Sequence, residues 1–193
     1  VREFGQCNVY HADIKGKVKK ITNGNHMLTM NDLVGSDAVA TWTDPSNPSD
    51  IISFSIDKPN KINRLTDVNK DIFYNVEFGE VEEITYKSVD EKYVQGWIVK
   101  PPNFDSNKKY PLVLRIHGGP HSMYHVGFNY NFQLHAAQDQ VVLYTNPRGS
   151  TGYGYDFANA IQNAYPGNDY DDIMYGVDEV ISRGYIDENR MYV

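Results

Sequence analysis

Two continuous apolar segments constrain the fold of this chain more than any other feature of its sequence. Residues 111–117 (PLVLRIH) and 141–145 (VVLYT) lack the alternation of polar and apolar residues that marks a strand with one solvated face. Continuous apolar strands are typical of a sheet that helices cover on both faces. Apolar residues at helical spacing occur in 130–137 and 155–165, so strands and helices alternate along the chain. This order predicts an α/β sheet with parallel strands.

A further helix is predicted to begin near Asn168 or Asp169, either of which can cap it, and to end at Gly184. Asp172 falls in its first turn, where the helix dipole favours negative charge. The apolar face of this helix consists of Ile173, Val177, Val180 and Ile181. Residues 191–193 then begin another apolar strand.

The chain changes character near residue 79. After it, residues 82–89 and 93–100 are predicted to form a hairpin around the turn 90–92. Pro101 and Pro102 end this hairpin, because proline cannot donate to a sheet ladder.

The part before residue 79 contains an internal repeat. A shift of 44 positions aligns Asp13 with Asp57, Lys17 with Lys61, Val18 with Ile62, Lys20 with Arg64, Ile21 with Leu65, Thr22 with Thr66 and Asn25 with Asn69. A period of this size, built from short strands, is that of one four-stranded propeller blade. A generic β-meander with a chance match is the alternative that the pattern leaves open.

Composition excludes several classes of partner. The formal net charge of −7 argues against nucleic acid, because phosphate contacts need clustered Lys and Arg. No apolar run approaches the roughly 20 residues that a membrane helix needs, so no membrane association is predicted. The single cysteine, Cys7, excludes an internal disulfide framework. Neither the cellular compartment nor the oligomeric state is predicted.

The motif His117-Gly118-Gly119-Pro120-His121 directly follows the first apolar strand. Catalytic loops lie at the carboxyl ends of strands in open α/β sheets. Two successive glycines let backbone N–H groups face a cavity, and acyl transfer needs such donors to stabilise the oxyanion of its tetrahedral intermediate. An HGG-type loop after the third strand of an α/β-hydrolase supplies one of them. The alternative is an ordinary Gly-Pro turn, which the position after a buried strand disfavours.

A second glycine-rich loop, residues 146–154 (NPRGSTGYG), follows the second apolar strand. Its spacing matches neither GxGxxG nor GxxxxGK[ST], so nucleotide binding has little support and no cofactor is predicted. Ser150 lies in RGSTG, and none of the 15 glycines has a serine two residues after it. The chain therefore contains no GxSxG nucleophile elbow.

The histidines at 117, 121 and 125 are spaced by four, as zinc ligands on a helix would be. The residues 118–120 between the first two prevent a helix, so no metal site is predicted. His135, on a predicted helix, is expected to be a packed or surface residue rather than a catalytic base.

Three segments together carry a family resemblance: 115–121 (RIHGGPH), 146–154 (NPRGSTGYG) and 184–193 (GYIDENRMYV). They resemble the prolyl oligopeptidase family of serine peptidases, most of all its acylaminoacyl-peptidase and dipeptidyl-peptidase branch. Residues 79–104 are similar to the start of the hydrolase domain in that family, and the repeat is similar to the end of its propeller.

The resemblance implies a fold and a domain organisation. Residues 1–78 would be the C-terminal part of a β-propeller, comprising its last one to two blades. Residues 79–193 would be the N-terminal half of an α/β-hydrolase catalytic domain, with a mostly parallel sheet and flanking helices.

The resemblance also implies an activity on short peptides. Such an enzyme cleaves near the N-terminus of its substrate through a Ser–Asp–His triad and an acyl-enzyme. In this fold the triad follows the chain order Ser, Asp, His. All three are expected after Val193, so residues 1–193 are expected to be a fragment that is inactive by itself.

Some site residues carry over from the family motifs. Gly119 is expected to provide one backbone N–H of the oxyanion hole, and Gly118 and Pro120 are expected to shape its loop. Arg148 and Tyr153 are expected to support the site without contacting substrate. Two alternatives remain: a catalytically inactive peptide-binding module with this fold, and a lipase or esterase, which the propeller-like repeat disfavours.

Overall fold

The computed structural model describes all residues from Val1 to Val193, and the chain divides into two compact units. The first unit contains residues 1–76 together with 125–129, and the second contains residues 77–124 and 130–193. The division after Val76 lies close to the expected boundary between residues 78 and 79. The inclusion of 125–129 in the first unit was not predicted.

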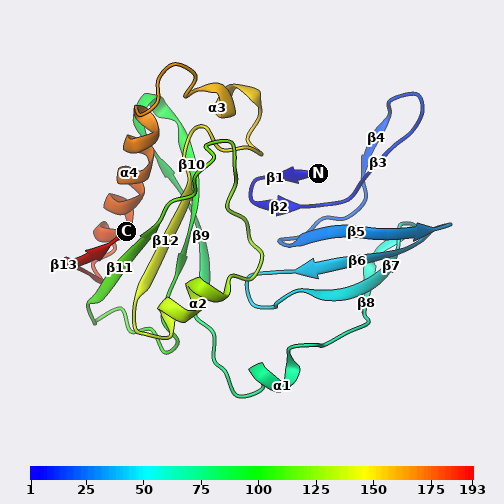
Figure 1. The fold of residues 1–193 in the computed structure, drawn as a ribbon, viewed down its shortest axis with the longest axis horizontal. Coiled ribbons are helices and arrows are strands. Elements are labelled where there is room, and N and C mark those ends of the chain that lie inside the picture. Colours follow the sequence, from blue (N-terminus) through cyan, green and yellow to red (C-terminus); the bar gives the residue numbers. More distant parts are fainter. The chain divides into compact units, whose positions relative to one another are not determined.

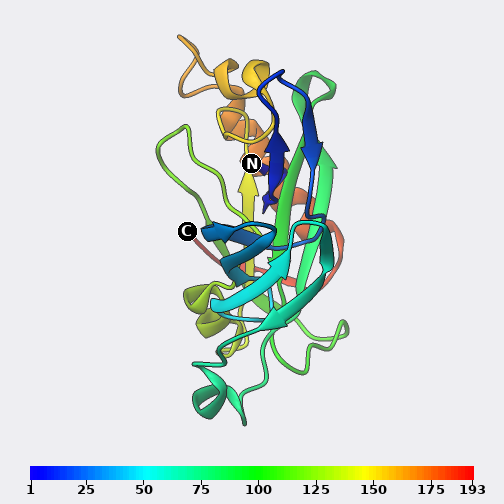
Figure 2. The same cartoon turned by 90° about the vertical axis from the view of Figure 1, so that its right-hand side faces the viewer.

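Short strands and one helical turn build the first unit (Figure 1, Figure 2). Its larger sheet has the strand order β1-β2-β5-β6-β7-β8, and β3 and β4 form a separate pair. The elements are β1 (Arg2–Glu3), β2 (Gln6–Cys7), β3 (Tyr10–Ala12), β4 (Val18–Lys20), β5 (Met27–Val34), β6 (Asp37–Thr43), β7 (Asp50–Ser55), β8 (Lys58–Arg64) and α1 (Lys70–Phe73).

Strands β5 to β8 form an antiparallel meander, in which each strand pairs with the next along the chain. Strand β7 buries alternate side chains, so Ile52 and Phe54 face one side of the sheet. They pack with Leu28, Ala38 and Ala40 from the two preceding strands. The core of this unit therefore lies on one face of strands β5, β6 and β7.

The 44-residue repeat of the sequence is also a repeat of structure. The hydroxyl of Thr22 accepts the N–H of Val9 at 2.9 Å, and the hydroxyl of Thr66 accepts the N–H of Ile51 at 2.9 Å. In both copies the threonine follows a hairpin, β3–β4 in the first and β7–β8 in the second. The two threonines are 44 positions apart and their N–H partners 42 positions apart, so the copies make equivalent contacts with a local offset of two residues.

The same two threonines each bind a buried polar side chain. Thr22 donates its hydroxyl to Asn8 at 3.1 Å, whereas Thr66 donates to Asp50 at 2.6 Å. The carboxylate of Asp50 also forms an ion pair with the guanidinium of Arg64. The two copies thus differ in charge at one buried position, and only the charged copy needs a cation beside it.

The second unit contains a five-stranded sheet of order β13-β11-β12-β10-β9 with three α-helices (Figure 1). Its strands are β9 (Val81–Lys87), β10 (Tyr93–Val99), β11 (Tyr110–Arg115), β12 (Val141–Asn146) and β13 (Ile186–Tyr192). Its helices are the 3-10 turn η1 (Val89–Glu91), α2 (Tyr130–Ala136), α3 (Tyr155–Asn159) and α4 (Asn168–Ser182).

This sheet is mixed, which corrects the expected mostly parallel sheet. Strand β11 runs parallel to both β12 and β13. Strand β10 runs antiparallel to both β9 and β12, because the 81–99 segment is a tight hairpin whose second strand docks against β12. The parallel part is therefore confined to the three strands that lie next to the glycine-rich loops.

Helices cover both faces of the sheet, as the continuous apolar strands predict. On one face Phe132 of α2 packs against Tyr144, with ring centroids 4.6 Å apart, and Tyr144 stacks on Trp97. On the other face Val177 and Val180 of α4 join the core formed by alternate residues of the strands. Every residue of β12 is buried as a result.

Several element boundaries differ from the predictions. Helix α3 covers only Tyr155–Asn159 of the predicted 155–165. No side chain caps α4 as predicted for Asn168 or Asp169; instead the Asp169 carboxylate accepts the N–H of Gly167 at 2.7 Å. Strand β13 begins at Ile186 rather than at Met191, with an irregular register against β11. No helix of the structure has the length and apolar character to cross a membrane.

Candidate active site

The first glycine-rich loop follows β11 and lies at the surface. Both Gly118 and Gly119 are exposed. Gly119 has a φ of +133°, and a Cβ added there would lie 3.2 Å from the Cβ of Ser122. A Cβ added to Gly118 would meet open space. The N–H of Gly119 donates to no acceptor of the chain, so it is available to a ligand.

The second glycine-rich loop follows β12, and its first half is packed instead of exposed. All residues from Asn146 to Ser150 are buried. Gly149 has a φ of +99°, and a Cβ added there would lie 2.7 Å from Cδ1 of Ile161. Its N–H donates to the carbonyl of Phe157 at 2.9 Å. The close approach to Ile161 and the positive φ explain why glycine occupies this position.

Hydrogen bonds join the two loops. The Nε2 atom of His117 lies 3.0 Å from Oγ of Ser150. The N–H of Thr151 donates to the carbonyl of Ser122 at 2.9 Å. The first loop is therefore held at both of its ends by the second.

Ser150 is the serine that most resembles a nucleophile in sequence, but only 1% of it is exposed. Its hydroxyl is therefore nearly inaccessible to solvent, although Ser150 is one of the residues that line a cavity beside the two loops. The burial agrees with the absence of a GxSxG motif around this residue.

Arg148 and Asp172 form a buried ion pair beneath the second loop. The guanidinium donates from Nε and from Nη2 to the two carboxylate oxygens, each at 2.8 Å, and the backbone N–H of Arg148 donates at 2.8 Å as well. The carboxylate also accepts the hydroxyl of Ser88 at 2.6 Å. Hydrogen bonding to Asp172, opposed by burial, raises the pKa of Arg148 above its ordinary value.

Arg148 extends this network to the turn between β9 and β10. Its Nη1 donates to the carboxylate of Asp90 at 3.3 Å, and its Nη2 donates to the carbonyl of Val89 at 3.2 Å. The backbone of Asp90 is left-handed, with a φ of +57°. One arginine thus connects strand β12, helix α4 and the β9–β10 turn.

Tyr153 and Asn146 form a second polar cluster. The side chain of Asn146 accepts the N–H of Tyr124 at 2.7 Å and donates to its carbonyl at 2.9 Å. It also donates to the hydroxyl of Tyr153, which in turn donates to Gln95. Burial raises the pKa of Tyr153 above its ordinary value, so its hydroxyl keeps its proton. The cluster fixes the chain at residue 124, just after the first loop.

A cavity of about 200 Å³ lies beside the two loops. Gly118, Gly119 and Pro120 line it from one side, and Ile161 and Ile173 contribute apolar surface. Backbone donors and apolar walls in one hollow at the carboxyl ends of parallel strands form a site suited to an acyl group.

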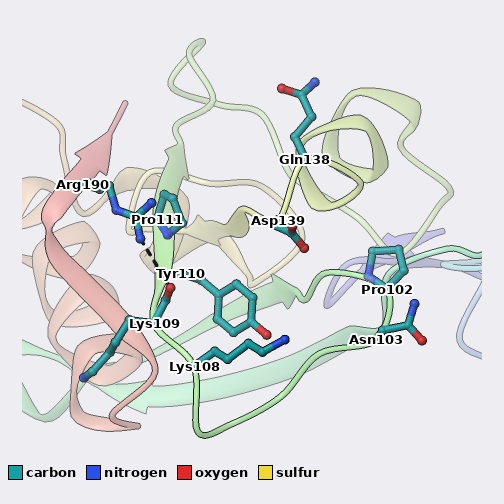
Figure 3. Close-up of a pocket in the computed structure, with 9 residues that line it drawn as sticks. All are labelled: Pro102, Asn103, Lys108, Lys109, Tyr110, Pro111, Gln138, Asp139 and Arg190. Carbon is teal, nitrogen blue, oxygen red and sulfur yellow. Dashed lines mark hydrogen bonds between the residues drawn. The ribbon is translucent and has the colours of Figure 1, made fainter.

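A larger hollow, of about 390 Å³, lies at the opposite end of β11, where Tyr110 and Pro111 begin the strand (Figure 3). Two of the cationic side chains around it bind carbonyl groups of the chain: Arg190 donates to Lys109 at 3.4 Å (Figure 3), and Lys109 donates to Gly184 at 2.7 Å. The cavity beside the glycine-rich loops is the stronger candidate for a catalytic site, because it lies at the carboxyl ends of parallel strands and is lined by exposed glycine backbone.

Comparison with known proteins points to one family. Residues 126–193 match the family model described as the prolyl oligopeptidase family. The chain is 37% identical over 192 residues to "Uncharacterized peptidase YuxL" of Bacillus subtilis, which covers 98% of this chain and 29% of that protein. The chain belongs to the prolyl oligopeptidase family.

Further relatives and structures of this peptidase family agree with the assignment. Dipeptidyl-peptidase 5 of Porphyromonas gingivalis is 29% identical over 189 residues, covering 96% of this chain and 28% of the relative. The acylaminoacyl peptidase of Pyrococcus horikoshii matches with a TM-score of 0.85 at 29% identity, over 98% of this chain and 30% of that structure. An acylaminoacyl peptidase in complex with Z-Gly-Gly-Phe-chloromethyl ketone matches with a TM-score of 0.86 at 29% identity, over the same shares of both chains.

The chain spans 29% of the length of the Bacillus subtilis relative.

The structure brings the predicted site residues together in part. Gly118, Gly119 and Pro120 share one exposed loop at the cavity. Arg148 and Tyr153 lie behind it, each in a buried hydrogen-bond cluster. The catalytic roles of these five residues remain predictions.

Sequence reasoning missed three residues that shape the site: Asp172, Asn146 and, as the partner of His117, Ser150. Asp172 was expected to contribute to the helix dipole, but it is fully buried against Arg148. Asp172 precedes Ile173, which lies on the apolar face of the predicted helix, but this pattern does not indicate that Asp172 itself is buried. The signal in the sequence was Arg148, because an arginine in a loop that follows a buried strand needs a carboxylate partner if it is buried as well.

Proposed function

We propose that the complete protein is a serine peptidase that cleaves short peptides near their N-terminus through an acyl-enzyme. The single observation that carries this proposal is the unengaged N–H of Gly119, at the carboxyl end of a parallel strand and at the edge of a cavity. The substrate is expected to be an acylated amino acid or a dipeptide at the start of a short chain, as the names of the relatives suggest.

In this mechanism the N–H of Gly119 acts at the transition state. A serine hydroxyl attacks the scissile carbonyl carbon, a histidine takes the proton and then gives it to the leaving amine, and water releases the acyl group. The carbonyl oxygen becomes negatively charged during the attack. A fixed backbone donor stabilises that charge without reorganising, which lowers the barrier more than it strengthens substrate binding.

The nucleophile is proposed to lie outside residues 1–193. No serine of the chain lies in a GxSxG motif, and the one in the second loop is buried. Strand β13 runs parallel to β11 on the side away from β12. A nucleophile at the carboxyl end of β13 would therefore lie beside the loop that carries Gly119.

Activity and labelling of the full-length protein test this function. We expect hydrolysis of acylaminoacyl or dipeptidyl p-nitroanilides, together with stoichiometric covalent labelling by a fluorophosphonate. Labelling with hydrolysis of p-nitrophenyl esters but of no peptide substrate would indicate an esterase. Peptide binding without labelling would indicate an inactive binding module. Either of these results would refute the proposal.

A further inference from the structure

The loop that carries Gly119 has few ways to hold its own shape. Gly118 and Gly119 have no side chains, and Pro120 has no N–H to donate. Within the segment, the N–H of Ser122 donates to the carbonyl of Pro120 at 2.8 Å. The side chain of His117 is therefore the principal polar group that connects the start of this loop to the rest of the unit.

Both ring nitrogens of His117 have a hydrogen-bond partner. The Nδ1 atom lies 3.2 Å from the carbonyl oxygen of Gly118, and the Nε2 atom lies 3.0 Å from Oγ of Ser150. A hydroxyl can either donate or accept, so Ser150 can bind Nε2 whichever ring nitrogen carries the proton. Only 1% of Ser150 is exposed, so this contact is shielded from solvent.

The rest of the second loop holds Ser150 rigidly. Its own N–H donates to the carbonyl of Pro147 at 3.0 Å, which closes a tight turn. Within that turn, Arg148 makes three hydrogen bonds to the carboxylate of Asp172, and Gly149 packs closely against Ile161. A hydroxyl fixed in this way can fix the ring that it binds.

We propose that Ser150 is a positioning residue: its hydroxyl orients His117, and His117 sets the position of the Gly119 N–H that stabilises the oxyanion. The effect on catalysis rests on the proposed function, whereas the orientation of His117 by Ser150 does not. The Arg148–Asp172 pair is the anchor from which this positioning extends to the exposed loop.

The test compares Ser150→Ala with wild type in the full-length protein, with Ser182→Ala as the control. Ser182 is an exposed serine at the end of α4 whose hydroxyl binds only the carbonyl of Glu179. For Ser150→Ala we expect kcat on a peptide p-nitroanilide to fall by about tenfold or more with KM changed by less than about twofold, because the lost alignment acts at the transition state. Ser182→Ala should match wild type in both constants.

Amide hydrogen exchange provides a readout that does not need catalysis. In Ser150→Ala the N–H groups of Ser122 and Thr151, which hold the far end of the loop, should exchange faster than in wild type. Unchanged exchange at these two amides would overturn the proposal, as would an unchanged kcat in an active enzyme. A wild-type protein without peptidase activity would refute the proposed function alone, and exchange would still decide the role of Ser150.

A second variant covers the case in which Ser150→Ala does not fold. His117→Ala removes the other partner of the same hydrogen bond from a half-buried position. It should lower kcat and accelerate exchange at Ser122 in the same way, and the double variant should be no worse than either single one. Additive losses in the double variant would show that the two residues act independently and would contradict the proposal.

Discussion

Arg148 and Asp172 form a bidentate ion pair in which Nε and Nη2 of the arginine each lie 2.8 Å from a carboxylate oxygen of the aspartate. The aspartate side chain is fully buried, and the arginine side chain is 7% exposed. Two charges at this depth are tolerated only as a pair with further hydrogen bonds. The pair joins the loop after β12 to helix α4, so the glycine-rich loops depend on it for their shape.

Replacing Asp172 by asparagine should strongly destabilise the second unit. The guanidinium of Arg148 would keep its charge and lose its buried counter-charge, and breaking one side of such a pair costs about 3–5 kcal/mol. Urea unfolding of the full-length protein measures the loss. Asp178→Asn, at an exposed position of the same helix, should change the free energy of unfolding by less than about 0.5 kcal/mol. Equal effects of the two variants would contradict the buried pair.

Removing the hydroxyl of Tyr153 should also destabilise the protein, by a smaller amount. Tyr153→Phe deletes an acceptor for Asn146 and a donor for Gln95, which costs about 1–3 kcal/mol when buried groups lose partners. Tyr155→Phe is the matched control, because Tyr155 is 78% exposed. Thermal unfolding of the two variants checks the difference, and a Tyr153→Phe midpoint equal to that of Tyr155→Phe would contradict the cluster.

The carboxylate of Asp50, in the second copy of the repeat, should make the stability of the first unit depend on pH. Burial alone would raise the pKa of Asp50, but hydrogen bonds from Thr66 and Arg64 outweigh burial and hold that pKa below its ordinary value of 3.8. A carboxylate whose folded-state pKa is lowered stabilises the fold above the unfolded pKa, and this contribution is lost as the pH falls through the folded value.

Asp50→Asn tests this dependence, because in the first copy of the repeat the residue that accepts the equivalent threonine hydroxyl is already an asparagine, Asn8. The variant should be less stable than wild type at about pH 6 and should approach it at about pH 3. Thermal unfolding midpoints at the two pH values give the comparison. Asp57→Asn, at an exposed position of the same hairpin, should retain the acid dependence of wild type. A constant difference between Asp50→Asn and wild type at both pH values would be inconsistent with ionisation of Asp50.

Local patterns in the sequence predicted much of the fold. The continuous apolar segments became β11 and β12, each followed by its glycine-rich loop. The 82–100 hairpin and the helix that ends before Gly184 also match, because hydrophobic periodicity and glycine conformations are properties of neighbouring residues. Family membership followed from motifs in the same loops and is confirmed by the comparisons.

The misses concern contacts between residues far apart in the chain. The antiparallel pairing of β10 with β12 depends on which strands become neighbours in the sheet, and the hydrophobic periodicity within either strand does not determine that. Likewise, Asp172 and Asn146 are ordinary residues in their local sequence, and only the fold brings them to Arg148 and Tyr124. The propeller origin of the first unit and the catalytic role of Gly119 stay predictions.

Steady-state kinetics of Gly119→Ala in the full-length protein test the central claim most directly. The matched control is Gly184→Ala, because Gly184 also has a positive φ, +85°, and ends α4 away from the glycine-rich loops. Alanine is strained at both positive-φ positions, but at Gly119 its Cβ would also lie 3.2 Å from the Cβ of Ser122, whereas nothing lies within 4 Å at Gly184. Alanine keeps its backbone N–H, so the change at Gly119 acts by displacing that donor from the oxyanion. We predict that Gly119→Ala lowers kcat on a peptide p-nitroanilide by about 100-fold or more, as expected for a lost oxyanion donor, while Gly184→Ala retains the wild-type kcat. A kcat for Gly119→Ala equal to that of Gly184→Ala would contradict the assignment of Gly119 to the oxyanion hole.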